Sequence, residues 1–315
     1  MNKKRNIYIL LTLPCLIAII SLQAILPTPP HKELKLSLDT LKLLKNPNSS
    51  VLEILTVIYL AILIIGFGNL ISFTIRNFRK KILPIAVQQS RFTLSEENAS
   101  KLILSIILLI LVTYLFEIII LLPKWKINIK ALPLFLNFAV EVGVIMIIMK
   151  FISLKTFGFN LKKRCFSFTL KSYITILPVI LGLFFLNYSI LEKMGMRFSL
   201  NPVIGLFLSL KDNFLVSILL LQIILFGPLA EELFFRGFLY NLAKQKYGFV
   251  ASALIVSSIF AMLHRNPQEI FPLFILSAAM CYIYERTQNI ASPIIFHILH
   301  NSLSMSFLIV IKNLT

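Results

Sequence analysis

Long apolar stretches separated by short charged segments are the dominant pattern along this chain. About nine of these stretches approach the roughly 20 residues that an α-helix needs to cross a bilayer. They cover residues 7–26, 51–74, 102–122, 131–152, 172–191, 214–240, 249–264, 270–284 and 290–311. A helix that faces lipid is apolar on every side, so length and flanking charge indicate these spans better than periodicity does. The pattern predicts an all-α, polytopic transmembrane helical bundle of about eight to nine spans.

The composition is typical of a membrane protein, and the positions of the Lys and Arg residues account for the net charge. Hydrophobic residues make up 58% of the 315 residues, charged residues make up 14%, and the mean hydropathy is +0.88. A typical soluble domain is about one quarter charged, so this chain lies far from the soluble class. The net charge of +18 comes from Lys and Arg residues that lie mostly between the apolar stretches, where anionic lipid headgroups attract them. We therefore expect an integral, multi-pass membrane protein, with the lipid bilayer and not a nucleic acid as its partner.

Two carboxylates and an arginine interrupt the apolar stretch 214–240, in the sequence "GPLAEELFFRG". Ionisable groups inside a membrane span are costly and indicate a functional site. Glu232 and Arg236 are four residues apart, so on a helix they share one face and can form an ion pair. Glu231 points about 100° away around the same helix. The spacing therefore predicts that Glu231 is left free to react.

Pro228 precedes these carboxylates by one helical turn. Proline has no backbone N–H, so in an α-helix it would leave the carbonyl of Ile224 without its usual donor. Such a break kinks a helix and exposes a polar backbone group. We therefore expect a small polar pocket beside the two glutamates.

Two further polar pairs occur in the apolar stretches that follow. The sequence "FAMLH" places Phe260 and His264 four residues apart, and "HILHN" places His297 and Asn301 four residues apart. Counting about 1.5 Å of rise per residue from the neighbouring loops puts both pairs at nearly the depth of Glu231. The sequence therefore predicts one catalytic cavity within the C-terminal helices.

These side chains supply the groups that acid–base hydrolysis requires. Glu231 can take a proton from water, and His264 can hold that water or share the proton. His297 and Asn301 can donate to the oxyanion that forms when water attacks an amide carbonyl. The predicted chemistry is peptide hydrolysis by a glutamate-activated water.

At these residues the chain resembles the CAAX prenyl endopeptidase superfamily of intramembrane proteases, also called CPBP or Abi. The motifs of that superfamily are E-E-x-x-x-R, F-x-x-x-H, and H-x-x-x-N or D. They match "EELFFR", "FAMLH" and "HILHN" in the right order and on separate spans. The resemblance covers about residues 214–311. We therefore expect a protease domain over residues 171–315, preceded by an N-terminal transmembrane region, residues 1–170, without recognised motifs.

The resemblance implies a helical bundle with a polar cavity that opens to one side. It also implies which residues carry the reaction. The four catalytic residues would be Glu231, His264, His297 and Asn301, and the three supporting residues would be Glu232, Arg236 and Phe260. Of the catalytic four, the first activates the water, the second holds it, and the last two bind the oxyanion. The implied substrate is a hydrophobic or lipidated peptide, and its prenylation is left open.

Three acidic or basic residues do not fit this interpretation directly. His300 stands beside Asn301 and is an alternative to His297, which we favour because only His297 is four residues from Asn301. Glu117 and Glu141 lie in apolar stretches and have no role in the proposed hydrolysis. They support an alternative, a polytopic transporter in which buried carboxylates form a relay, although the inverted repeats typical of transporters are not found. A non-catalytic immunity or binding protein of the membrane is a further alternative.

The sequence gives no reason to expect a cofactor. Cys15, Cys165 and Cys281 are far apart in the chain, which is typical neither of a disulfide framework nor of a metal site. The H-E-x-x-H pattern of zinc peptidases is missing, and Glu and His ligands would have to come from three helices. A zinc peptidase therefore stays open as a less favoured alternative.

Overall fold

The computed structural model describes residues 49–79, 92, 94–121, 132–195, 201–264 and 266–314. Every regular element in these parts of the chain is a helix, so the predicted all-α fold class is confirmed for them. The predicted first span, residues 7–26, lies outside the described residues.

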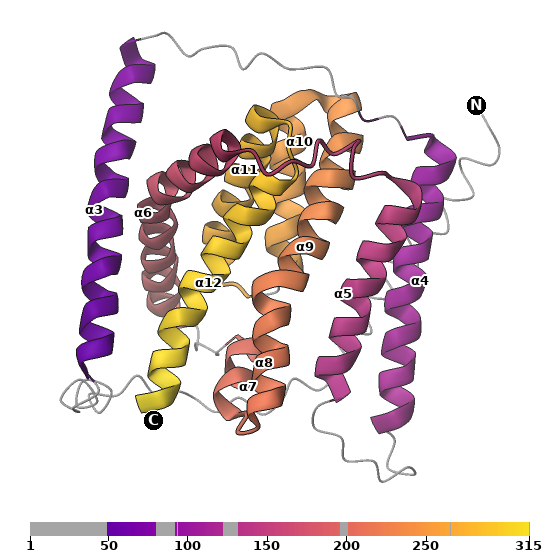
Figure 1. Cartoon of the computed structure of the whole chain (residues 1–315), viewed down its shortest axis with the longest axis horizontal. Coiled ribbons are helices and arrows are strands. Elements are labelled where there is room, and N and C mark those ends of the chain that lie inside the picture. The colour runs from indigo at the N-terminus through magenta and orange to yellow at the C-terminus, as the bar shows by residue number, and fades with distance from the viewer. Residues whose placement is uncertain are drawn as a thin grey trace.

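The elements are α3 (Ser49–Arg79), α4 (Glu96–Leu121), α5 (Leu132–Phe151), α6 (Lys163–Lys193), α7 (Pro202–Ser209), α8 (Asn213–Leu221), η2 (Gln222–Phe226), α9 (Gly227–Glu232), η3 (Leu233–Tyr240), α10 (Asn241–Leu263), α11 (Ile270–Thr287) and α12 (Ala291–Leu314). The two η elements are π-helical turns. In Figure 1, α9 and α12 lie at the centre, α3 and α6 lie on one side, and α4 and α5 lie on the other. Packing agrees with this view, because α6 contacts α3, α11 and α12, whereas α5 contacts α4 and α9.

Six helices among the described residues are long and apolar enough to cross a membrane, judged by length and composition. One of them, Asn213–Leu263, contains both of the predicted stretches 214–240 and 249–264. Gly248, with φ +73°, interrupts helical geometry between these two stretches. The predicted stretch 270–284 falls in α11, which is not among the six. The count of eight to nine spans therefore stays a prediction.

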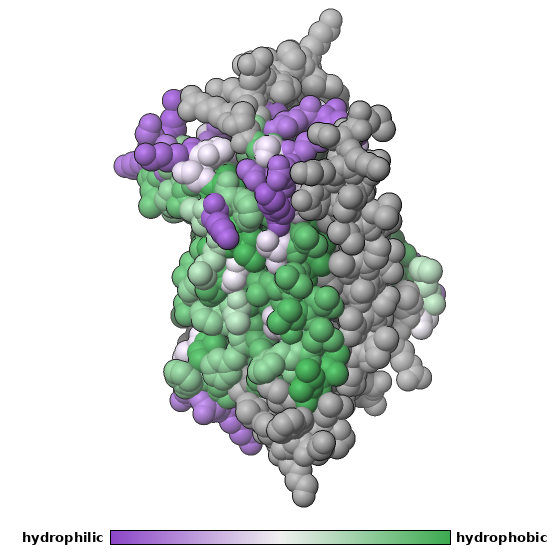
Figure 2. All heavy atoms as spheres, turned by 90° about the vertical axis from the view of Figure 1, so that its right-hand side faces the viewer, coloured by the Kyte–Doolittle hydropathy of each residue, from purple (hydrophilic) through white to green (hydrophobic). Residues whose placement is uncertain are grey.

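On the face shown in Figure 2, the coloured surface is hydrophobic in its middle and hydrophilic towards its two ends. The outer helices α3 and α4 expose many large apolar side chains, including Ile64, Ile71 and Leu108. Soluble proteins rarely expose contiguous apolar surface on this scale, so these side chains face lipid. The protein is therefore an integral membrane protein.

A single large core cluster joins helices from both halves of the chain. Ile148 of α5, Leu177 of α6, Phe260 of α10 and Phe296 of α12 belong to it, and each of these four is at most 1% exposed. The predicted domain boundary between residues 170 and 171 falls inside α6, and the division into two regions stays a prediction.

The loop after α5 is fixed to the turn between α11 and α12. Ile290 N–H donates to the Phe157 carbonyl at 3.0 Å, and Asn289 makes hydrogen bonds with the backbone N–H and carbonyl of Asn160. Gly158 has φ +68°, and a Cβ there would lie 2.0 Å from the Gln288 carbonyl oxygen. Only glycine fits this contact, which holds α5 beside the C-terminal helices that carry the motifs.

Candidate catalytic site

Glu232 and Arg236 form a completely buried ion pair. Arg236 Nη1 lies 2.8 Å from Glu232 Oε1, and both side chains are 0% exposed. The predicted i, i+4 pair is therefore confirmed. Arg236 Nη2 also donates to Ser277 of α11, to its Oγ at 2.6 Å and its carbonyl oxygen at 3.1 Å. The pair thus ties two helices together and satisfies most of the guanidinium's donors.

His297 links the two neighbouring glutamates. Its Nδ1 lies 2.9 Å from Glu232 Oε1, and its Nε2 lies 4.0 Å from Glu231 Oε2. The Glu232 carboxylate can only accept when ionised, so His297 Nδ1 carries the hydrogen of this bond. Nε2 is thereby aimed at Glu231. The imidazole from α12 brings the first and third predicted motifs together.

Glu231 differs from Glu232 in both exposure and bonding. Its side chain is 36% exposed, while that of Glu232 is 0% exposed. Oε2 of Glu231 is nevertheless buried and has no hydrogen-bond donor. Oε1 of Glu232 is therefore committed to Arg236 and His297, and Oε2 of both glutamates is buried without a partner. Only Glu231 of the two is also partly exposed, so it is the carboxylate that a water or a substrate can reach.

Phe260 packs against three polar groups of the site. Its ring centroid lies 4.6 Å from that of His264 and 6.0 Å from that of His297, and the Arg236 guanidinium lies over its face at 5.0 Å. The side chain is 0% exposed. Phe260 thus lies between the two imidazoles and the cation, and its predicted supporting role stays a prediction.

His264 closes α10 with its side chain turned back on the helix. Its Nδ1 lies 2.7 Å from the carbonyl oxygen of Phe260. A carbonyl oxygen only accepts, so Nδ1 carries the hydrogen, and whenever the ring is neutral its Nε2 is an acceptor. This tautomer suits a side chain that receives a hydrogen bond from water.

Asn301 binds a backbone carbonyl that the π-helical turn η2 exposes. In this turn the Gly227 N–H donates to the Gln222 carbonyl, five residues earlier. The next donor in that register would be Pro228, which has no N–H, so the Ile223 carbonyl has no partner within the helix. Asn301 Nδ2 donates to this carbonyl at 2.7 Å.

The sequence predicts that Pro228 frees the carbonyl of Ile224, the acceptor in an α-helical register, and this prediction is wrong by one residue. The π-helical turn shifts the freed carbonyl by one residue, to Ile223. The bond fixes the side-chain amide of Asn301 and leaves one of its two N–H hydrogens for another acceptor.

His300 packs towards α6. Its ring is edge-on to that of Tyr173 on α6, with centroids 6.2 Å apart, and its Nδ1 is buried without a partner. Among the contacts of the described residues, His297 and not His300 meets the two glutamates. The oxyanion role of His297 stays a prediction.

Ser277 and Gln222 join the site although sequence reasoning did not select them. Ser277 is a 0% exposed polar residue in an apolar helix, and Gln222 is a 4% exposed one whose Nε2 donates to the Leu134 carbonyl of α5. A lone polar residue inside an apolar stretch was the available signal. Glu117 lies on α4, which packs chiefly on α5.

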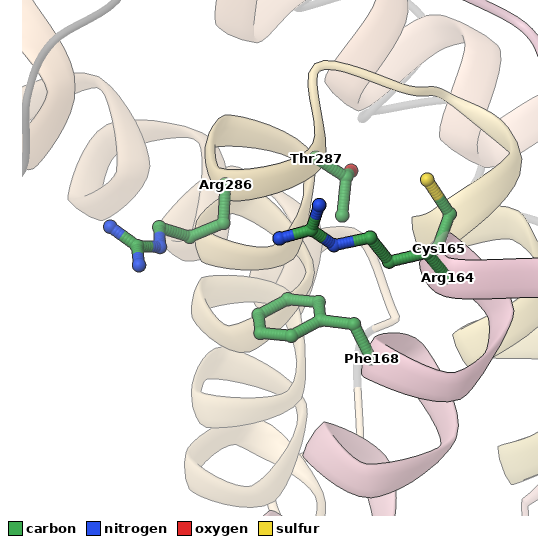
Figure 3. Close-up of a pocket in the computed structure, with 5 residues that line it drawn as sticks. All are labelled: Arg164, Cys165, Phe168, Arg286 and Thr287. Carbon is green, nitrogen blue, oxygen red and sulfur yellow. The ribbon is translucent and has the colours of Figure 1, made fainter.

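One pocket of about 340 Å³ lies away from the motif residues (Figure 3). It is lined by Arg164, Cys165, Phe168, Arg286 and Thr287, which come from the start of α6 and the end of α11. The predicted catalytic cavity among the C-terminal helices therefore stays a prediction. In the described parts of the chain, no three His, Cys, Asp or Glu side chains are grouped so that they could hold a metal ion.

Comparisons with known proteins concern the segment that carries the three motifs. Residues 212–303 match the family model described as type II CAAX prenyl endopeptidase Rce1-like. A Bacillus subtilis (strain 168) protein described as "Putative membrane peptidase YdiL" is 29% identical over 76 residues, which are 24% of this chain and 31% of that protein. The match thus spans about a third of the relative's length, and no solved structure matches the chain. The comparisons confirm the resemblance predicted from the three motifs: residues 212–303 match a domain of the Rce1-like CAAX prenyl protease family.

Proposed function

We propose that this protein is a glutamate-dependent intramembrane endopeptidase of the CAAX prenyl protease type. The observation that carries the proposal is the unequal bonding of two adjacent carboxylates. Glu232 is 0% exposed and its Oε1 accepts hydrogen bonds from both Arg236 and His297, whereas Glu231 is 36% exposed and its Oε2 has no donor. A committed carboxylate beside an uncommitted one supports a division between holding the site and doing the chemistry.

In the proposed reaction, Glu231 is the general base. It takes one proton from a water molecule while the water oxygen bonds to the carbonyl carbon of the scissile peptide. The Nε2 lone pair of His264 accepts a hydrogen bond from that water and holds it in place. The Nδ1 hydrogen bond to the Phe260 carbonyl supports this role, because it leaves Nε2 without a hydrogen when the ring is neutral.

His297 and Asn301 are proposed to stabilise the oxyanion. Nδ1 of His297 is held by Glu232, which orients the ring so that its Nε2 faces Glu231, and the Nε2–H of a protonated ring would donate to the oxyanion. Asn301 has one N–H beyond the bond to Ile223. Glu231 then passes its proton to the amine nitrogen as the C–N bond breaks, which restores the carboxylate and balances the reaction.

We propose a hydrophobic or lipidated peptide as the substrate and a bacterial cell membrane as the location. The hydrophobic middle of the surface supports access from the bilayer (Figure 2). Donors set in a water-poor bundle act more strongly than the same groups in water, which supports electrostatic catalysis at this depth.

Mass spectrometry of membrane peptides tests the proposal. Membranes that contain the wild-type protein should yield new peptide termini that are missing from membranes with an equal amount of the Glu231→Gln variant. Identical peptide inventories in the two membranes would contradict the peptidase and favour the transporter or binding-protein alternative.

A further inference from the structure

Glu141 is a carboxylate that α5 brings to the proposed site from outside the family-matched segment 212–303. It lies in an apolar span with Lys150 as the only other charged residue of its helix. An acidic residue at such a position is costly, so its surroundings should show what retains it.

Those surroundings are the face of α9 that carries Glu231. Glu141 Oε1 lies 3.6 Å from the position that a Cβ of Gly227 would occupy. Gly227 precedes Glu231 by four residues, so the two share one helical face. The carboxylate of Glu141 therefore lies beside Gly227, one turn from the proposed base.

Two interactions connect this carboxylate to the site. Glu141 is close enough to Glu231 for repulsion between their charges, and its side chain makes a hydrogen bond with Gln222. Gln222 in turn donates to the backbone of α5 at Leu134, at 3.1 Å. Gln222 thus holds α5 and its carboxylate against the π-helical turn that precedes Glu231.

The cluster of Glu141, Gln222 and Glu231 has fewer donor hydrogens than its buried oxygens need. Three of its oxygens are buried acceptors without a partner, namely Glu141 Oε2, Gln222 Oε1 and Glu231 Oε2. Two carboxylates that approach each other in a low-dielectric site do not both ionise, because their repulsion favours a proton on one of them. A proton on Glu141 would provide the missing donor and remove the repulsion.

Position assigns that proton to Glu141. The side chain of Glu231 is 36% exposed and lies 4.0 Å from His297 Nε2. Glu141 Oε2 is buried without a partner, and among the described residues no cationic side chain forms an ion pair with Glu141. A buried carboxylate without a counter-ion is costly when ionised, so Glu141 is the carboxylate that holds the proton.

We propose that Glu141 is a positioning residue, whose protonated carboxyl group donates a hydrogen bond within this group and keeps Glu231 ionised as the base. This inference rests on the proposed function and adds to it a contribution from α5. It predicts that a neutral side chain with a donor can replace Glu141, whereas an apolar side chain of similar size cannot.

Two substitutions separate the donor from the charge. Glu141→Gln keeps an N–H donor without a charge, so its kcat should lie within about threefold of wild type. Glu141→Leu removes the donor, so its kcat should fall by about tenfold or more, with KM and Tm close to wild type. Glu117→Leu is the matched control, because Glu117 also lies in an apolar helix, the neighbouring α4. This variant should leave kcat unchanged.

Infrared spectroscopy provides a readout that does not depend on turnover. The carbonyl-stretch band of a protonated carboxyl group should be present in the wild-type protein and weaker in Glu141→Gln. This measurement decides the proposal even if Glu141→Leu does not fold.

Three results would overturn the inference. They are a wild-type kcat in folded Glu141→Leu, a kcat of Glu141→Gln as low as that of Glu141→Leu, and a carboxyl band unchanged by Glu141→Gln. Failure of the proposed function itself would look different, because Glu231→Gln would then keep its turnover whatever the result at Glu141.

Discussion

Nδ1 of His297 lies 2.9 Å from Oε1 of Glu232. The same oxygen also accepts the hydrogen bond from Arg236 Nη1, at 2.8 Å. Since Arg236 reaches Ser277, one carboxylate oxygen connects α9, α11 and α12. Glu232 therefore holds the bundle together and orients an imidazole, two tasks that its neighbour Glu231 does not share.

Substitution of Glu232 should damage stability first. Glu232→Gln leaves the buried Arg236 cation without its counter-charge, and breaking such a pair typically costs about 3 to 5 kcal/mol. The melting temperature and yield of the purified variant should both fall. The double variant Glu232→Gln with Arg236→Met removes the unpaired cation and should recover the melting temperature, while turnover stays low because His297 has lost its anionic acceptor. A double variant as unstable as Glu232→Gln would contradict this account of the ion pair.

Asn301 should contribute to both stability and turnover. In Asn301→Leu the Ile223 carbonyl loses its donor, and an unsatisfied buried polar group costs about 1 to 3 kcal/mol. Loss of one oxyanion donor should lower kcat by about 10²-fold. Ser304→Ala on the same helix is the control, because the exposed Ser304 hydroxyl binds only the His300 carbonyl of its own helix. Normal turnover in folded Asn301→Leu would remove Asn301 from the oxyanion site.

Glu269, in the turn between α10 and α11, should make stability depend on pH. Burial raises the pKa of the Glu269 carboxyl above its ordinary value, and the nearby His264 and the hydrogen bond from Asn201 oppose this only in part. A raised folded-state pKa means that the stabilising contribution is present at acid pH and lost as the pH rises through that pKa. Glu269→Gln should therefore melt at a higher temperature than wild type at alkaline pH and at the same temperature in acid. A difference that does not change with pH would show that burial of the charge is not its cause.

Metal chelation should have no effect on the proposed reaction. The base, the water-holding imidazole and the oxyanion donors are all side chains of this chain, so turnover with and without EDTA should agree within error. Loss of activity with EDTA and recovery with zinc would replace the glutamate-only mechanism by a metal-assisted one.

Local spacing in the sequence predicted the contacts within one helix better than those between helices. The ion pair of Glu232 and Arg236 follows from an i, i+4 spacing, and Pro228 correctly indicated an exposed carbonyl. The carbonyl proved to be that of Ile223, because the π-helical turn depends on packing that no single segment encodes. The approach of Glu141 to Gly227 was not predictable for the same reason, since α5 meets α9 only in the folded bundle.

The boundaries between spans were also only partly predictable from the sequence. The apolar pattern predicted the helices at 102–122 and 131–152, and they are α4 and α5. The stretches 214–240 and 249–264 form a continuous run of helical residues, in which only the left-handed geometry at Gly248 marks the break. A glycine in a sequence does not reveal its φ angle, so hydropathy alone could not fix how these stretches are joined.

The most direct test of the central claim is the turnover of Glu231→Gln, measured beside its melting temperature. Glutamine keeps the size of the side chain and removes the base, so kcat should fall by about 10²-fold or more. The melting temperature should stay near wild type, because Glu231 Oε2 has no hydrogen-bond donor to lose. A detergent-purified Glu231→Gln protein that melts like wild type and does not hydrolyse the peptide is the predicted result. Normal turnover in that variant would contradict the assignment of Glu231 as the catalytic base.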